Sequence, residues 1–182
     1  MSAMIRRATL LIPIVMLAGA APLAGQALQG HNANAPVDVE ADRIEVQDRQ
    51  DRAVFSGNVK VRQAGLALDA ARLTVAYAGG PSQGVDIQRL DAAGGVVVRS
   101  ASETARGQYA IYDLNRRQIT MLGGVSLEQR GNRINGGRLV IDLDTGRATV
   151  DGQSTAPAGS TIEGGTGGRV TGRFTVPQRT GQ

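Results

Sequence analysis

The sequence predicts an all-β fold in which stacked antiparallel hairpins form an elongated, two-sided structure, either a jelly roll or a solenoid-like sandwich. Three observations predict this class. Apolar and polar residues alternate with a period of two from residue 36 onward, glycine-containing motifs recur along the chain, and glycine accounts for 25 of 182 residues while aromatic residues make up only 3%. No stretch keeps a helical period over three turns. The length fits one domain.

The N-terminus has the pattern of a secretory signal peptide. Arg6 and Arg7 precede an apolar run from Ala8 to Ala21, and small residues continue to Ala27. We therefore expect a signal peptide over 1–27, cleaved after Ala27, and a linker over 28–35. The apolar run is shorter than a membrane span usually is. An uncleaved N-terminal anchor is the alternative.

Strands with one apolar and one polar face follow in order, which is typical of half-buried antiparallel strands. The alternating runs are 37–41, 44–46, 55–62, 66–68, 73–77, 96–98, 119–121, 125–127 and 139–143. Polar tips containing Gly, Asn or Asp separate them, at 48–51, 63–65, 113–116, 130–132 and 144–146. A Gly-, Ser- and Thr-rich loop is expected over 153–168, a last strand up to Pro177, and a disordered tail over 178–182. These boundaries give one domain over 36–177.

An internal repeat explains the spacing. The form Gly-[Asn/Gly]-Val-x-[Val/Leu] occurs at 57–61, 94–98 and 123–127. The offset between Gly57 and Gly123 also relates the surroundings of these two copies, for example Phe55 to Met121 and Leu73 to Leu139. The glycine at the head of each copy predicts a bulge or strand crossing where no side chain fits.

Composition argues against most enzyme classes. The chain has no cysteine and a single histidine, His31, which lies in the linker and is expected to have no partner. Carboxylate pairs such as Asp142 and Asp144 fall on one outward, solvated strand face, where nothing raises a pKa for acid catalysis. We expect no enzymatic activity, no metal site and no cofactor.

Charge argues against nucleic acid as a partner. The chain has 20 basic and 16 acidic residues, and removal of Arg6 and Arg7 with the signal peptide leaves 18 against 16, a net charge of +2. Arginines alternate with acids and do not form a patch that would follow a phosphate backbone. The apolar strand faces remain as the candidate functional feature. Periodicity alone leaves open whether they form a closed core or an apolar groove.

The residues at 36–42, 55–61 and 68–75 resemble the opening of the LptA/OstA family, the periplasmic lipopolysaccharide-transport bridge proteins. Residues 121–127 with 134–139 resemble the later repeat of that family, and 168–177 its closing strand. The resemblance covers residues 36–177. Gly124 stands where the family usually has Asn, and the stretch 153–168 is longer and looser than the family pattern.

The resemblance implies an open-ended jelly roll shaped like a folded sheet, exported to the periplasm, that holds the acyl chains of lipopolysaccharide in its interior. The implied partners are lipopolysaccharide, an inner-membrane jelly-roll component, an outer-membrane translocon, and further copies stacked head to tail. A membrane-anchored relative of the same pathway and a non-lipid β-rich binding module, for sugars for example, are the alternatives. The implied lipid-binding interior consists of Val37, Val39, Ile44, Val46, Phe55, Val59, Val61, Leu68, Leu73, Val75, Val98, Met121, Leu127, Ile134, Leu139 and Ile141.

The two terminal strands carry opposite charges on their outward faces. Asp38, Glu40 and Asp42 lie on the first, and Arg169 and Arg173 on the last. If these strands are the open edges of the sheet, the acidic edge of one module can pair with the basic edge of the next in a head-to-tail contact that does not close.

Overall fold

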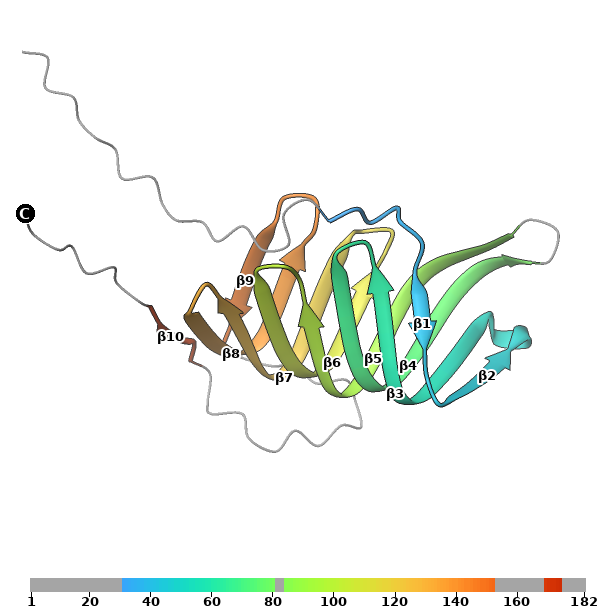
Figure 1. The fold of residues 1–182 in the computed structure, drawn as a ribbon, viewed down its shortest axis with the longest axis horizontal. Helices are drawn as coiled ribbons and strands as arrows, with labels where there is room; N and C mark the ends of the chain where they lie inside the picture. The colour runs from blue at the N-terminus through green and yellow to red at the C-terminus, as the bar shows by residue number, and fades with distance from the viewer. Residues whose placement is uncertain (1–30, 81–83, 153–168, 175–182) are drawn as a thin grey trace, which may run out of the picture.

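The protein is described by a computed structural model in which residues 31–80, 84–152 and 169–174 are placed. These residues form one antiparallel sheet (Figure 1). Its strands are β1 (Asp38–Glu40), β2 (Arg43–Gln47), β3 (Arg52–Gln63), β4 (Leu66–Gly80), β5 (Gly84–Arg99), β6 (Glu103–Asp113), β7 (Gln118–Gln129), β8 (Asn132–Asp142), β9 (Arg147–Asp151) and β10 (Thr171–Arg173). A short 3₁₀ turn, η1 (Asp48–Gln50), joins β2 to β3.

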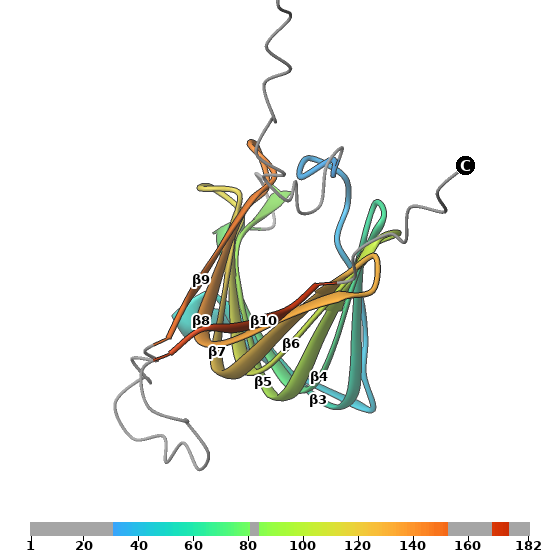
Figure 2. The same ribbon diagram turned by 90° about the vertical axis from the view of Figure 1, so that its left-hand side faces the viewer.

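The strand order is β1-β3-β4-β5-β6-β7-β8-β10, and β2 and β9 pair with β3 and β8 beside this path. Each ladder from β3 to β8 has a register shift near the middle of the strands. β1 pairs with β3 on one side of the shift and β2 on the other, and β10 and β9 do the same with β8. The sheet is therefore folded lengthwise into two walls, which Figure 2 shows as a V. We call the wall from β1 to β10 wall 1 and the wall from β2 to β9 wall 2.

The fold line passes through the repeated glycines. Gly94 and Gly123 have φ of +86° and +83°, and a Cβ at these positions would lie 2.7 Å from Ala71 Cβ and 2.8 Å from Gln108 Cβ. Each is followed by a second residue with positive φ, and Asn58 takes this second position after Gly57. Only glycine adopts the first conformation without strain and leaves room for the adjacent strand. The bulge predicted at the head of each repeat is confirmed.

The constant offset between the first and third copies is confirmed in the strand boundaries. β3 spans Arg52–Gln63 and β7 spans Gln118–Gln129, so both ends differ by the same offset that separates Gly57 from Gly123. The register shift between Ser56 and Val59 recurs at the same offset between Leu122 and Val125. The all-β, open-ended folded sheet expected from the sequence is the fold of the molecule.

Several predictions at the ends of the chain fall outside the described residues. The signal peptide (1–27), the loop over 153–168 and the tail over 178–182 are among them, as is the end of the last strand beyond residue 174. The described part of the chain contains no helix long and apolar enough to cross a membrane.

Candidate functional site

The apolar side chains of both walls face the inside of the V. Cross-strand partners share a face of a sheet, so the register defines rows of side chains that run along the sheet from end to end. One row on wall 2 contains Ile44, Phe55, Leu73, Ala92, Ala110, Met121, Leu139 and Val150. A second contains Val46, Ala53, Val75, Leu90, Tyr112, Ile119, Ile141 and Ala148. The row on wall 1 contains Val39, Val61, Leu68, Val98, Ala105, Leu127, Ile134 and Gly172.

The rows meet in one continuous core. Leu73, Met121 and Leu139 are 0% exposed. Apart from Ala53, the buried members of the rows belong to a single apolar cluster that also includes Val59 at the fold line. Side chains therefore fill the space that the ribbon in Figure 2 leaves between the walls. In this state the interior is a packed core.

The structure places the residues implied by the resemblance on this one inner surface. Fourteen of the sixteen are row members, Val59 lies at the fold line, and Val37 packs against the core from the segment before β1. Two of the sixteen are exposed, Ile44 at 55% and Val46 at 58%. They lie on the same inner face of the sheet as their cross-strand partners Phe55 and Ala53. However, β2 has a neighbouring strand on one side only, so nothing covers them.

The rows also contain residues that the sequence did not single out. Small side chains, Ala92, Ala105 and Ala110, occupy the centre of the rows, and Tyr112 is the one large polar side chain among them. Alanines contribute little to an alternation of apolar and polar residues, so the sequence pattern does not predict β6.

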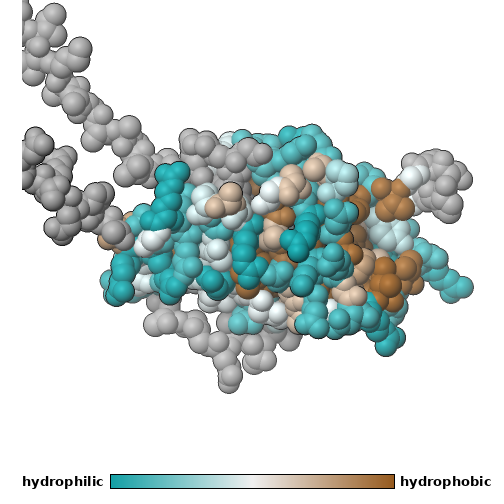
Figure 3. All heavy atoms as spheres, in the orientation of Figure 1, coloured by the Kyte–Doolittle hydropathy of each residue, from teal (hydrophilic) through white to brown (hydrophobic). Residues whose placement is uncertain are grey.

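Exposed apolar side chains lie at the two ends of the sheet. Ile44, Val46 and Val85 are exposed at the end formed by β2 and the β4–β5 hairpin, where hydrophobic atoms are visible in Figure 3. Val170 (45% exposed) and Phe174 (64% exposed) flank β10 at the other end. Apolar side chains thus reach the surface at both ends. At β2 they are members of the two wall 2 rows, and at β10 they lie on either side of the last member of the wall 1 row, Gly172.

The strands expected to be edges are the edges. β1 and β10 end the strand order, with Asp38, Glu40 and Arg173 exposed on them and Arg169 exposed just before β10. Asp42 does not belong with the acids of β1. It follows β1 in the bend to β2, where its carboxylate accepts a hydrogen bond from Asn58 Nδ2 at 2.9 Å, so it supports the first glycine bulge.

A polar cluster crosses the open side of the V. Gln63 of wall 1 is 2% exposed, and its Oε1 accepts a hydrogen bond from the hydroxyl of Tyr112 of wall 2 at 2.8 Å. His31 Nε2 donates to the same oxygen at 3.1 Å. Gln63 Nε2 donates to the carbonyls of Ala33 and Ala35 at 2.9 and 3.0 Å. Both N–H groups of the Gln63 amide therefore donate a hydrogen bond, and both lone pairs of its oxygen accept one.

This cluster corrects two expectations. His31 was expected to have no partner and contacts both walls. Gln63 was expected at an exposed tip but is the buried last residue of β3. Burial raises the pKa of Tyr112 to about 12, against a smaller opposing effect of Arg117, so its hydroxyl stays protonated and able to donate. Burial also lowers the pKa of His31, and the hydrogen bond to Gln63 offsets part of that shift.

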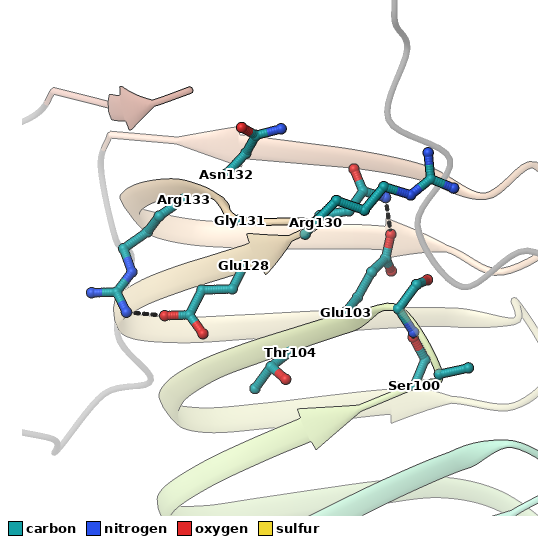
Figure 4. A pocket seen from close by; sticks show the side chains of 11 residues that line it. Ser100, Glu103, Thr104, Glu128, Arg130, Gly131, Asn132 and Arg133 are labelled. Carbon is teal, nitrogen blue, oxygen red and sulfur yellow. Dashed lines mark hydrogen bonds and ion pairs between the residues drawn. The ribbon is translucent and has the colours of Figure 1, made fainter. Parts of the chain in front are cut away.

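A polar cavity of about 400 Å³ lies on the rim of wall 1, between the tips of the β5–β6 and β7–β8 hairpins (Figure 4). Gln129 Nε2 donates a hydrogen bond to the buried Glu103 there, and Arg133 pairs with Glu128. The described residues contain no group of three or more acidic or histidine side chains suited to hold a metal ion.

A folded antiparallel sheet with an apolar interior that reaches the surface at both ends defines an open-ended jelly roll. Comparison with solved structures agrees: the chain superposes on LptH, described as the LptA-homologous periplasmic component of the conserved lipopolysaccharide transport device of Pseudomonas aeruginosa. The TM-score is 0.65 at 19% identity, over 78% of this chain and 96% of that one. The match establishes the fold.

Sequence comparisons establish the family. Residues 38–147 match the family model of the LptA/(LptD N-terminal domain) LPS transport protein. An uncharacterised protein of Rhizobium meliloti (strain 1021) is 36% identical over 146 residues, which cover 78% of each chain. The chain belongs to the LptA/LptD N-terminal domain family and is a lipopolysaccharide-transport domain, as the motifs at 36–42, 55–61 and 121–127 predicted.

Proposed function

We propose that the chain is a periplasmic bridge module that binds lipopolysaccharide and carries it from the inner to the outer membrane, with the acyl chains held between the two walls. The observation that carries this proposal is the set of aliphatic rows, which run the length of the sheet and emerge at both ends. An apolar interior that served only as a core would have no reason to continue into exposed residues such as Val46 and Phe174. Family membership supports the same ligand.

The energetics set a condition on such a conduit. Burial of one methylene stabilises by about 0.8 kcal/mol, so full enclosure of a chain of about twelve carbons is worth roughly 10 kcal/mol. A module that bound this tightly would retain its ligand. Side chains of the core can take the place of acyl chains when the ligand leaves, which reduces the net gain, and identical modules in series make each transfer nearly isoenergetic. The driving force then comes from elsewhere in the system.

We further propose that modules stack head to tail, with the β1/β2 end of one copy against the β9/β10 end of the next. Unpaired strand edges at both ends favour strand addition, and unlike ends give a contact that does not close into a ring. Exposed apolar residues at both ends would continue the interior across the junction. By the same logic the terminal modules would contact an inner-membrane jelly-roll component and an outer-membrane translocon.

The proposal includes export. Residues 1–27 would be removed as a signal peptide, which leaves a periplasmic chain with no enzymatic role. N-terminal sequencing of the protein from cells tests this step: a mature protein that starts near Leu28 supports it, whereas an intact Met1 would favour the membrane-anchored alternative.

Photo-crosslinking tests the lipid-binding role. A photoreactive amino acid is placed at Phe55, which is on the inner face, and at Lys60 of the same strand, which is exposed on the outer face, and adducts with lipopolysaccharide are sought in cells. Adducts at position 55 and not at 60 are expected. If neither position forms adducts in a folded protein, the interior is a closed core that does not bind lipopolysaccharide.

A further inference from the structure

The segment from His31 to Val37, which we call the strap, passes over the open side of the V before it joins β1 (Figure 2). Its contacts reach both walls. Ala33 and Ala35 accept hydrogen bonds from Gln63 of wall 1, and Asn34 Oδ1 accepts one at 3.3 Å from Arg117, which lies in the turn between β6 and β7 of wall 2. The strap therefore ties the two rims of the V together.

The strap is held by the polar cluster of His31, Gln63 and Tyr112, which we call the clasp. Gln63 is central because its amide hydrogens go to the strap while its oxygen goes to Tyr112 and His31. Only an amide in one orientation satisfies all four bonds. Because His31 Nε2 donates, its Nδ1 carries no hydrogen, and Nδ1 is the one buried side-chain polar atom in the described part of the chain that has no hydrogen-bond partner.

A cavity of about 420 Å³ lies beside the strap. It is lined by residues 33–37, by Gln63, by Ile87 near the start of β5 and by Leu114 in the turn between β6 and β7. Ile87 and Leu114 both pack against the core. Asp86 and Asn115 also line it. The cavity therefore lies against the edge of the core, and the strap forms one of its sides.

We propose that this cavity is the port through which acyl chains enter the interior, and that the clasp keeps it shut until the strap is displaced. The inference rests on the proposed lipid-binding role. Three observations support it. The interior is packed while the strap is in place, and the strap bridges both rims. The part of the strap before Val37 is attached by a few hydrogen bonds, and only Val37 packs against the core. A segment held in this way opens at lower cost than the core itself.

The test compares isosteric variants with matched controls. Gln63→Glu puts a carboxylate oxygen against the two strap carbonyls, and Tyr112→Phe removes the hydroxyl that donates to Gln63. The controls Gln108→Glu and Tyr109→Phe make the same chemical changes at two positions of β6 that lie outside the clasp. Hydrogen exchange of the strap amides and stopped-flow binding of a pyrene-labelled lauric acid are measured for each full-length mature protein.

We expect exchange in the strap to rise at least tenfold, and the association rate severalfold, in both clasp variants and in neither control. Faster exchange with unchanged association rates would overturn the proposal, as would unchanged exchange in Gln63→Glu. If the wild-type chain and all variants fail to bind the probe at equilibrium, the proposed lipid-binding role fails and the port fails with it.

A covalent lock gives the converse test. The chain has no cysteine, so Asn34→Cys with Arg117→Cys introduces two unique thiols at a strap-to-wall contact. Linkage by a reducible bismaleimide should slow association at least tenfold, and reduction of the linker should restore it. Equal rates before and after reduction would contradict the proposal.

Discussion

The middle and the ends of the sheet use the same rows of side chains differently. In β4 to β8 all row members except the half-buried Ile134 are buried, because each strand has a neighbour on both sides and the opposite wall above it. At β2 the two rows of wall 2 continue into Ile44 and Val46, which are more than half exposed, and Phe174 is exposed beyond β10. The inner face is therefore a repeating surface, and the burial of each side chain on it depends on what lies next along the row. In the proposed head-to-tail stack, the next module would cover these exposed residues.

Truncation of a side chain in the middle should have the largest effect. Leu73→Ala removes a fully buried side chain from the centre of a row and should lower the free energy of unfolding by about 2–5 kcal/mol. Ile44→Ala, two positions along the same row at the end, should cost less than about 1 kcal/mol because its side chain is already exposed. Urea denaturation of both variants checks this, and equal losses would mean that the end is packed as the middle is.

The fold line offers a sharper contrast within one bulge. Gly123→Ala brings a methyl group to 2.8 Å from Gln108 Cβ in a left-handed conformation, whereas Gly124→Ala has the conformational strain but open space around it. We expect losses of about 2–3 kcal/mol and about 1 kcal/mol respectively. Thermal unfolding separates them. Equal losses would show that the close contact with Gln108 adds nothing to the conformational strain.

Charge reversal at the ends should change association and leave stability nearly unchanged. Arg169→Glu with Arg173→Glu should weaken head-to-tail assembly severalfold, since exposed ion pairs contribute about 0.2–1 kcal/mol each. Sedimentation at several protein concentrations measures the effect.

Restoring complementarity by Asp38→Lys with Glu40→Lys should recover part of the loss. Full rescue is not expected, because Asp38 and Glu40 lie opposite Arg62 and Lys60 in their own sheet. Additive losses without any rescue would exclude pairing between these edges.

Acid should loosen the strap by a smaller amount. Because the pKa of His31 lies below its usual value when the strap is closed, the closed state binds fewer protons than the open one. The closed state therefore keeps its full stability above about pH 6.5 and loses it progressively as the pH falls below that value. Arg117, through Asn34, and Asp86, at the cavity, are the charged groups that face the strap, and Tyr112 stays protonated throughout.

Hydrogen exchange of the strap between pH 5 and 8, corrected for the intrinsic rate, measures this effect. His31→Gln is the matched control, because it removes the only histidine of the chain. The wild-type opening equilibrium should rise toward acid and that of the variant should not. A pH dependence that persists in His31→Gln would assign it to another group.

The sequence predicted the elements whose pattern is local. Alternation indicated the inward parity of Phe55, Val61 and Leu139, and the constant offset between the first and third repeats predicted that β3 and β7 are equivalent. The repeated glycines located the fold line. Alternation predicts which face of the sheet a side chain lies on, but not whether that side chain is buried. The exposure of Ile44 follows only from the position of β2 at the edge of the sheet.

Periodicity along the sequence cannot predict contacts between residues that are far apart in the chain. Tyr112 and Gln63 are 49 residues apart and lie on different walls, and His31 is 81 residues from Tyr112. Nothing in the local sequence relates them. Strand β6 was missed for a different reason, because its inward positions include Ala105, Gly107 and Ala110, which are too small to register as an apolar face.

If acyl chains occupy the space between the walls, as proposed, Met121 is the most direct probe of them. Met121 is 0% exposed in the middle of a row, and the other three of the four methionines of the chain, Met1, Met4 and Met16, precede residue 28. The mature chain labelled with [methyl-¹³C]methionine, whose added initiator Met gives a separate signal, is titrated with lipid A that carries a nitroxide on an acyl chain. We predict that the Met121 methyl resonance broadens beyond detection and returns when the nitroxide is reduced. A sharp, unshifted Met121 signal at a lipid concentration that saturates binding would contradict the account.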